Sequence, residues 1–326
     1  MKLPRRKFLH FAAGAAALPA VSRIAWAQSY PTRPVRLLVG FPAGGVTDVF
    51  ARLMGQWLSE RLGQAFVIEN RMGAASNLAA EALVKAPPDG YTLLQLTSTK
   101  AINATLYEKL GFNLVTDIAP VATVYRGGPG AMVVNPSFPP KTVPEFITYA
   151  KANPGKINMG SAGSGSSAHL YGELFKMMAG VDLVHVPYRG GPQALTDLIA
   201  GRLQVTFDPL ANTIEHIKSG QLRAIAVTTA SRVALLPDTP AIAEFVAGYE
   251  ASGWQGIAAP KGSPAEIVDR LNKEINAGLA EARIKARFAD LGYTAFTSSP
   301  AEFGTFIAED VEKWAKVIKF GGIKPE

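Results

Sequence analysis

Two glycine-rich stretches of this sequence have the residue types and spacing that suit anion binding. The first, Gly40 to Asp48, reads GFPAGGVTD, and the second, Gly160 to His169, reads GSAGSGSSAH. Each follows a short apolar run typical of a β-strand and precedes apolar residues at the spacing of a helical face. A helix that starts in such a turn leaves backbone N–H groups unpaired and directs the positive end of its dipole at the turn. Both stretches therefore predict a place where an anion is held.

The second stretch also allows nucleophilic chemistry. Ser164 and Ser166 precede His169 closely enough for a serine nucleophile and a histidine base, so a hydrolase is a second hypothesis. We expect no acidic residue nearby to orient the imidazole. This favours a histidine that packs or hydrogen-bonds at a helix N-terminus.

A nucleotide cofactor is not expected. The spacing Gly163-x-Gly165-x-x-Ala168 fits a lenient dinucleotide fingerprint, but Asp182 comes before the next expected strand instead of ending it. The sequence contains neither a GxxxxGK[ST] phosphate loop nor a GxSxG nucleophile elbow.

Metal and thiol chemistry are also not expected. The sequence has no cysteine, which excludes disulfides, thiolate metal sites and cysteine nucleophiles. The four histidines, His10, His169, His185 and His216, lack the spacing that a zinc site uses.

The composition is that of an ordinary globular protein. The 326 residues are enough for two domains, with 48% hydrophobic and 18% charged residues. The net charge of +7 comes largely from residues 1–27, which hold five basic residues and no acidic one. The remaining 28 basic and 26 acidic residues form no basic stripe with interleaved aromatics, so we expect no nucleic-acid partner.

The N-terminus reads as an export signal. Arg5-Arg6 precedes an apolar stretch from Phe8 to Leu18, and Ala25-Trp-Ala27 fits an A-x-A cleavage pattern. The paired arginines favour twin-arginine export, while Pro4, where that pattern prefers Ser or Thr, leaves ordinary secretion open. The apolar stretch is shorter than the roughly 20 residues that span a membrane. We expect cleavage after Ala27 and a mature protein in the periplasm.

Strands and helices alternate along the mature sequence, which predicts an α/β fold with parallel sheets. The expected strands are Val35–Val39, Phe66–Glu69, Tyr91–Leu96, Ala131–Val134, Ile157–Met159, Leu183–Val186, Leu203–Phe207, Leu222–Val227 and Trp254–Ala259. The segment Val121 to Gly130 reads as a crossing into a second domain, and Trp254–Ala259 as the return. The later helices are expected over Pro264–Arg283 and Pro300–Ile318. We therefore expect two domains, 28–124 with 250–326 and 125–249, joined by two crossings around a ligand cleft.

Seven short motifs are distributed over essentially the whole mature chain. They are Tyr30-Pro-Thr-Arg-Pro34, Phe41-Pro-Ala-Gly-Gly-Val-Thr-Asp48, Glu69-Asn-Arg71, Pro88-Asp-Gly-Tyr91, Gly163-Ser-Gly-Ser-Ser-Ala-His169, Val186-Pro-Tyr-Arg-Gly190 and Arg223-Ala-Ile-Ala-Val-Thr228. Together they resemble the Bug-type solute receptors of tripartite tricarboxylate transporters. The resemblance implies a type II periplasmic binding-protein fold, in which two α/β domains close on one small ligand. It also implies a receptor without catalysis or cofactor, whose partners are the membrane subunits of the transporter.

The resemblance further implies that a ligand carboxylate is held between the glycine-rich turns of the two domains, partly through ordered water. Backbone N–H groups of residues 43–47 and 164–169 are then expected near the carboxylate. The expected ligand-binding residues are Phe41, Ala43, Gly44, Gly45, Val46, Thr47, Asp48, Asn70, Ala74, Ala75, Ser76, Thr97, Ser98, Ser164, Gly165, Ser166, Ser167, His169, Tyr188 and Asp208. The position of Asp208 after a strand allows two interpretations, a partner for a ligand ammonium group or a turn residue before Pro209.

The sequence departs from the family pattern at four positions. Gly40 and Ala43 stand where prolines are frequent, which predicts a less rigid first loop, and Met72 and Ala75 stand where Pro and Gly are common. The departures at Met72 and Ala75 affect the far end of the pocket. We therefore expect a monomeric periplasmic receptor for a small carboxylate: a di- or tricarboxylate, an aromatic acid or an acidic amino acid. The alternatives are the hydrolase and a ligand-presenting partner of a membrane sensor kinase.

Overall fold

The computed structural model describes residues 30–107, 110–321 and 323–324. The expected export signal and its cleavage after Ala27 lie outside these residues. The strands are β1 (Val35–Val39), β2 (Phe66–Asn70), β3 (Thr92–Thr97), β4 (Ile118–Gly128), β5 (Gly130–Val134), β6 (Asn158–Ser161), β7 (Val184–Pro187), β8 (Val205–Pro209), β9 (Arg223–Val227) and β10 (Gly253–Pro260). The helices are α2 (Val46–Leu62), α3 (Asn77–Val84), α4 (Ser98–Leu106), α5 (Val143–Ala152), α6 (Ser167–Ala179), α7 (Gly191–Ile199), α8 (Leu210–Lys218), the short 3₁₀ helix η1 (Ile242–Glu244), α9 (Ala265–Ala280), α10 (Ala282–Asp290) and α11 (Pro300–Gly321).

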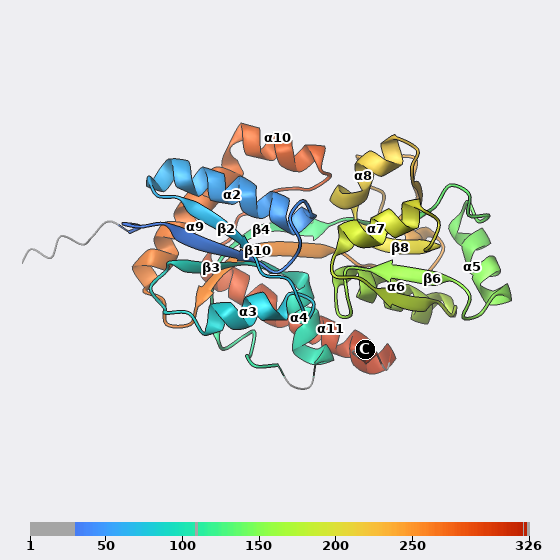
Figure 1. The fold of residues 1–326 in the computed structure, drawn as a ribbon, viewed down its shortest axis with the longest axis horizontal. Coiled ribbons are helices and arrows are strands. Elements are labelled where there is room, and N and C mark those ends of the chain that lie inside the picture. Colours follow the sequence, from blue (N-terminus) through green and yellow to red (C-terminus); the bar gives the residue numbers. More distant parts are fainter. Residues whose placement is uncertain (1–29, 108–109, 322, 325–326) are drawn as a thin grey trace, which may run out of the picture.

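The first sheet has five strands in the order β2-β1-β3-β10-β4. β1 pairs in parallel with β2 and β3, whereas β10 is antiparallel to both β3 and β4. Side chains alternate across the sheet: Leu37 and Leu93 pack with α2, α9 and α10, while Leu38 and Leu94 pack with α3, α4 and α11. Figure 1 shows α2 and α10 above this sheet and α3, α4 and α11 below it. Because both faces are buried, the strands read in the sequence as nearly continuous apolar runs.

The second sheet also has five strands, in the order β7-β6-β8-β5-β9. β6 is parallel to β7 and β8, and β5 is antiparallel to β8 and β9. Along β5, Ala131 and Val133 pack with α7 and α8, while Met132 and Val134 pack with α5 and α6. Helices therefore cover both faces of the second sheet as well, α7 and α8 on one face and α5 and α6 on the other.

The chain passes from the first sheet to the second after β4 and returns before β10. β4 ends at Gly128 and β5 begins at Gly130, so the first connection is a single residue. β10 is antiparallel to β4, with Gly253 paired opposite Gly128, so the two connections leave the first sheet side by side. The domain boundaries expected at 124/125 and 249/250 stay predictions, and β4 runs through the first of them.

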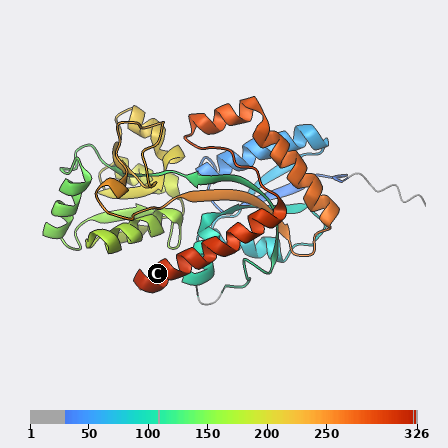
Figure 2. The ribbon, with the colours of Figure 1, turned by 180° about the vertical axis from the view of Figure 1, so that it is seen from behind.

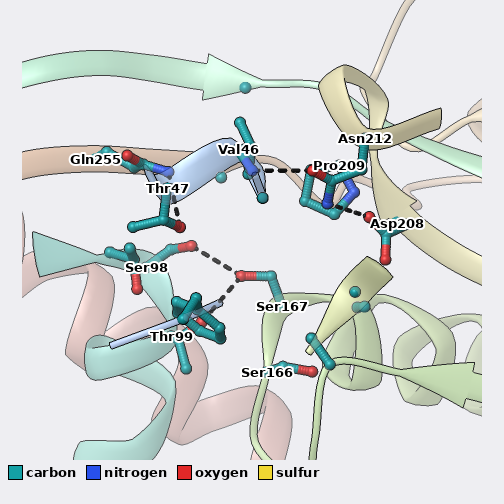
Figure 3. A pocket seen from close by; sticks show the side chains of 18 of the residues that line it. Val46, Thr47, Ser98, Thr99, Ser166, Ser167, Asp208, Pro209, Asn212 and Gln255 are labelled. Carbon is teal, nitrogen blue, oxygen red and sulfur yellow. Dashed lines mark hydrogen bonds between the residues drawn. The ribbon is translucent and has the colours of Figure 1, made fainter. Parts of the chain in front are cut away.

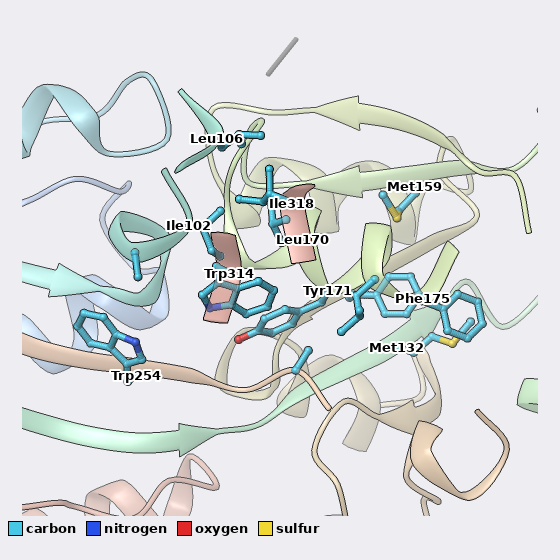
Figure 4. Packing of buried hydrophobic residues seen from close by; sticks show 14 of the residues in the cluster. Ile102, Leu106, Met132, Met159, Leu170, Tyr171, Phe175, Trp254, Trp314 and Ile318 are labelled. Carbon is cyan, nitrogen blue, oxygen red and sulfur yellow. The ribbon is translucent and has the colours of Figure 1, made fainter. Parts of the chain in front are cut away.

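One apolar cluster extends from the first sheet into the second. α11 packs on α4 and β4 and also reaches α6, and Figure 2 shows it lying across the back of the molecule. Trp314 of α11 is 1% exposed and stacks on Tyr171 of α6, with ring centroids 6.3 Å apart. Figure 4 shows these two rings among side chains from α4, α6 and β5. The C-terminal helix thus joins the cores of the two sheets.

The α/β fold class is confirmed, but the structure differs from the prediction in three details. The sheets are mixed rather than parallel, because β10 and β5 run against their neighbours. The chain passes to the second sheet at Gly128–Gly130, inside the segment expected as a crossing, but most of Val121 to Gly130 is strand β4, since its apolar part is buried between β10 and helices of both faces. The single helix expected over Pro264–Arg283 is interrupted at Glu281, which has an extended backbone and serves as the N-cap of α10.

Replacing Trp314 by alanine should lower the free energy of unfolding by about 3–5 kcal/mol, because it leaves a large void in the cluster that both sheets share. Urea denaturation followed by circular dichroism measures this loss. Lys316 is an exposed residue of the same helix, and Lys316→Ala should change stability by no more than about 0.5 kcal/mol. Equal losses in the two variants would contradict the buried position of Trp314.

Candidate functional site

Two helix N-termini line one buried cavity between the sheets. α2 begins at Val46 after its N-cap Gly45, and α6 begins at Ser167 after Ser166, whose Oγ accepts the N–H of His169. Helix geometry leaves the other first-turn N–H groups without intrahelical acceptors. The cavity has a volume of about 70 Å³. We call it the inner cavity, and Figure 3 shows side chains from both helix starts directed toward it.

The inner cavity brings together nine of the residues expected from the sequence. They are Phe41, Gly45, Val46, Thr47, Thr97, Ser98, Ser166, Ser167 and Asp208. These residues come from β3, β8 and the starts of α2, α4 and α6, so both sheets contribute to the same site.

Hydroxyl groups meet where the two sheets face each other. Ser167 Oγ lies 3.1 Å from Ser98 Oγ and 3.3 Å from Thr99 Oγ1. Beside them, Gln255, which pairs with Thr97 across β10 and β3, donates from Nε2 to Thr47 Oγ1 at 3.2 Å. The hydroxyl groups can rotate to donate or accept. They therefore suit those oxygen atoms of a polar ligand that the helix starts do not bind.

An asparagine bridges the first helix start to a buried carboxyl group. The N–H of Val46 donates to Asn212 Oδ1 at 2.9 Å, and Asn212 Nδ2 donates to Asp208 Oδ1 at 2.5 Å. Figure 3 shows this chain of bonds running from α2 to α8 and β8. One N–H group of the α2 start is therefore occupied by the protein itself.

Asp208 is the buried carboxyl group of the inner cavity. It is 0% exposed, and its Oδ2 has no hydrogen-bond partner among the described residues. Burial raises the pKa of Asp208 to about 6, and the hydrogen bond from Asn212 opposes this rise only in part. The carboxyl group is therefore costly to ionise in the folded protein.

A second, larger cavity adjoins the first at Phe41 and Ala162, which line both. Its volume is about 500 Å³, and we call it the outer cavity. Further expected site residues line it, namely Ala74, Ala75, Ser76, Ser164 and Tyr188. The Tyr188 hydroxyl donates to Asp197 Oδ2 at 2.6 Å, and burial together with this carboxylate raises the pKa of Tyr188 to about 12.

The wall of the outer cavity contains an unusual backbone. Ala74, Ala75 and Ser76 are consecutive left-handed residues, with φ of 46°, 47° and 71°. For residues other than glycine this conformation costs about 1–2 kcal/mol each. Gly40 allows the segment to lie against the first loop, because a Cβ there would be 1.8 Å from Ser76 Oγ. Close packing against Ser76 thus explains why this chain has glycine at position 40, where the family pattern often has proline.

Six expected residues line neither cavity: Ala43, Gly44, Asp48, Asn70, Gly165 and His169. Asp48 supports the first loop, because it accepts hydrogen bonds from Gly44 N, Arg52 and Asn70. Burial alone would raise the pKa of Asp48, but these bonds hold it below its ordinary value. Asn70 also donates to the Phe41 carbonyl at 2.9 Å. Asp48 and Asn70 therefore shape the loop from behind.

His169 is held by scaffold groups on both ring nitrogens. Its Nδ1 accepts the N–H of Gly165 at 3.0 Å, its Nε2 lies 3.7 Å from Glu173 Oε1, and its ring stacks on His185 at 3.7 Å. The expectation that no acidic residue lies near this histidine is wrong, because Glu173 is one helical turn away in α6. Ser166 uses its hydroxyl as the helix cap.

The sequence did not single out several polar and aromatic residues of the inner cavity: Tyr125, Tyr171, Asn212, Gln255 and Tyr293. Two of them carried a usable signal. Gln255 is a glutamine inside an apolar strand, and Asn212 follows Asp208 by four residues, one turn of a helix. The tyrosines come from β4, α6 and a loop after α10, and their meeting depends on the packing of the two sheets.

Within residues 30–107, 110–321 and 323–324, no group of three or more His, Asp or Glu side chains is arranged to hold a metal ion. In the same part of the chain, every helix is too short or too polar to cross a membrane.

The raised pKa of Asp208 predicts a pH-dependent stability. The folded state disfavours the ionised carboxylate, so the wild type should lose stability as pH rises from about 4 through about 6, up to about 3 kcal/mol for a shift of two units. Asp208→Asn removes this loss. The stability of the variant minus that of the wild type should therefore be larger at pH 8 than at pH 4. Thermal unfolding across this range measures the difference. The exposed Asp269 provides the control, since Asp269→Asn should show no such trend.

Comparison with known proteins identifies the family of this chain. Residues 50–323 match the family described as "Tripartite tricarboxylate transporter family receptor". Protein BugT of Bordetella pertussis is 35% identical over 303 residues, covering 91% of this chain and 92% of BugT. The resemblance to Bug-type receptors is therefore confirmed.

Solved structures confirm the two-lobed periplasmic binding-protein fold. R. palustris Rpa4515 with adipate has a TM-score of 0.88 and 39% identity, covering 91% of this chain and 100% of that one. Periplasmic binding protein BugD has a TM-score of 0.87 and 34% identity, with the same coverage. MatC from Rhodopseudomonas palustris with bound malate has a TM-score of 0.84 and 30% identity, covering 89% and 100%. This chain thus belongs to the TctC/Bug family, the periplasmic solute-binding receptors of tripartite tricarboxylate transporters.

Proposed function

We propose that this receptor captures a small organic acid by its carboxylate, between the N-termini of α2 and α6, and delivers it to the membrane subunits of a tripartite tricarboxylate transporter. It performs no reaction on the ligand and acts as a monomer after export and removal of residues 1–27. The ligand-binding residues are those of the inner cavity, together with the wall of the outer cavity.

One observation carries this proposal: two helix starts share a cavity whose described lining includes no Lys, Arg or His side chain. The positive potential at this place comes from backbone N–H groups and helix dipoles. Such a site suits a compact anion, and the surrounding hydroxyls suit a carboxylate whose oxygens take several hydrogen bonds. The adipate and malate named with two structures of the same family support an organic acid as ligand.

Domain closure explains how such a site selects its ligand. The α2 start belongs to the proposed domain 28–124 with 250–326, and the α6 start to the proposed domain 125–249. A carboxylate that bridges the two helix starts binds well only when they are close, so it stabilises the closed arrangement. The small residues at this junction support close approach, since a Cβ on Gly190 would lie 2.3 Å from Pro42 Cγ.

The surroundings of His169 disfavour the hydrolase alternative. A general base needs a ring nitrogen within reach of the nucleophile, but both nitrogens of His169 face scaffold groups. Ser166 is committed to capping α6. A receptor without catalysis is therefore the function that the site supports best.

Isothermal titration of the purified protein against succinate, malate, adipate, citrate, benzoate and glutamate tests the proposal. At least one of these acids should bind to the wild type. Ser167→Asp places a negative charge at the first residue of α6, beside the proposed carboxylate position. Two like charges about 4 Å apart at a protein surface repel by about 4 kcal/mol, so binding should weaken about a thousandfold. The same charge favours the helix dipole, so the thermal stability of the variant should be kept.

Ser231→Asp is the matched control, because it makes the same charge change in an exposed loop. It should bind the acids as the wild type does. The carboxylate proposal is wrong if no acid in the panel binds to the wild type, or if Ser167→Asp binds as tightly as Ser231→Asp.

A further inference from the structure

A buried lysine lies behind the wall of the outer cavity. Lys100 in α4 is 1% exposed, and its Nζ donates to the Ala75 carbonyl at 2.6 Å and to Asn77 Oδ1 at 2.5 Å. Burial lowers the pKa of Lys100 well below its usual value, which favours the neutral amine. The Ala75 carbonyl and Asn77 Oδ1 each accept one hydrogen bond from this amine.

Asn103, one turn further along α4, repeats the same pair of bonds. It is 0% exposed, and its Nδ2 donates to the Ala75 carbonyl at 3.1 Å and to Asn77 Oδ1 at 2.9 Å. Two buried donor groups therefore converge on one backbone carbonyl and on the first residue of α3.

The carbonyl that receives these bonds belongs to Ala75, the middle residue of the left-handed segment Ala74–Ser76. Residues with a Cβ seldom adopt this conformation three times in succession, and such a segment persists only where its surroundings hold it. All three residues line the outer cavity. The hydrogen bonds from α4 therefore hold the cavity wall from behind.

Helix α4 also contacts the opposite wall of the outer cavity. The Tyr107 hydroxyl, directly after α4, donates to the Ser164 carbonyl at 2.9 Å. Asn103 Oδ1 packs so close to Gly165 that a Cβ there would lie 2.3 Å away. Asn103, which bonds to the Ala74–Ser76 wall, is thus also in direct contact with the second glycine-rich turn.

We propose that Lys100 and Asn103 are positioning residues that fix the Ala74–Ser76 wall and thereby set the length of the dicarboxylate that the receptor accepts. The inference rests on the proposed function. A ligand whose first carboxylate lies at the helix starts reaches the outer cavity past Phe41 and Ala162, the residues common to both cavities. Arg189, the one cationic side chain among the described residues lining the outer cavity, suits a second carboxylate there.

A short acid and a long acid should therefore respond differently to a change in this wall. Succinate ends within or near the inner cavity, whereas adipate and suberate extend against Ala74–Ser76. Lys100→Met keeps the length and burial of the side chain but removes its N–H donors. In this variant the ratio of the adipate to the succinate dissociation constant, measured by isothermal titration, should change about tenfold or more.

A second substitution separates positioning from loss of stability. Glycine adopts left-handed backbone conformations without penalty, so Lys100→Met with Ala75→Gly should bring the ratio back toward the wild-type value. Lys85→Met, the same chemical change at an exposed lysine of the neighbouring segment, should leave the ratio unchanged. Thermal unfolding of each variant records stability independently.

Amide hydrogen exchange of residues 73–77 provides a readout that needs no ligand. Exchange should be faster in Lys100→Met than in the wild type and slower again in the double variant. Faster exchange with an unchanged adipate-to-succinate ratio would overturn the assignment of length selectivity. Unchanged exchange would overturn the positioning role itself. If no dicarboxylate binds to the wild type, the proposed function fails, while the exchange data still decide the positioning role.

Discussion

The backbone N–H groups at the starts of α2 and α6 impose the constraint on which the rest of the structure depends. They have no acceptors within their helices and lie in a cavity, so oxygen atoms from elsewhere must reach them. The turns that precede these helices are built from small residues, which let those atoms approach. Asn212 supplies one such oxygen to Val46. The positive electrostatic potential at the helix starts comes from backbone N–H groups. It therefore changes neither with the protonation nor with the rotamer of a charged side chain.

Holding two helix starts at one place requires a stable frame on both sides. Each start follows a strand of a different sheet, and each sheet is covered by helices on both faces. The cluster around Trp314 and Tyr171 runs from one sheet to the other beneath the cavity. The polar site is therefore supported by apolar contacts that involve residues far apart in the sequence.

The sequence predicted the parts of the molecule that local patterns determine. Strand-turn-helix units at Gly40–Asp48 and Gly160–His169 follow from apolar spacing and glycine placement. What the sequence could not reveal depends on long-range packing. The tyrosines of the inner cavity meet only because β4, α6 and the loop after α10 come together. Helix α4 was missed because its first residues, Ser98 and Thr99, read as a polar loop, and the importance of Lys100 was missed because a lysine is normally expected at the surface.

The pairing of β4 with β10 has a mechanical consequence. The two strands leave the first sheet as an antiparallel ribbon that ends at the Gly128–Gly253 pair, with Gly127 and Gly130 beside it. A hydrogen-bonded ladder opposes sliding of one strand along the other, because sliding would break the paired bonds. We therefore expect this ribbon, with its glycines at the end, to yield by bending more easily than by sliding of one sheet past the other.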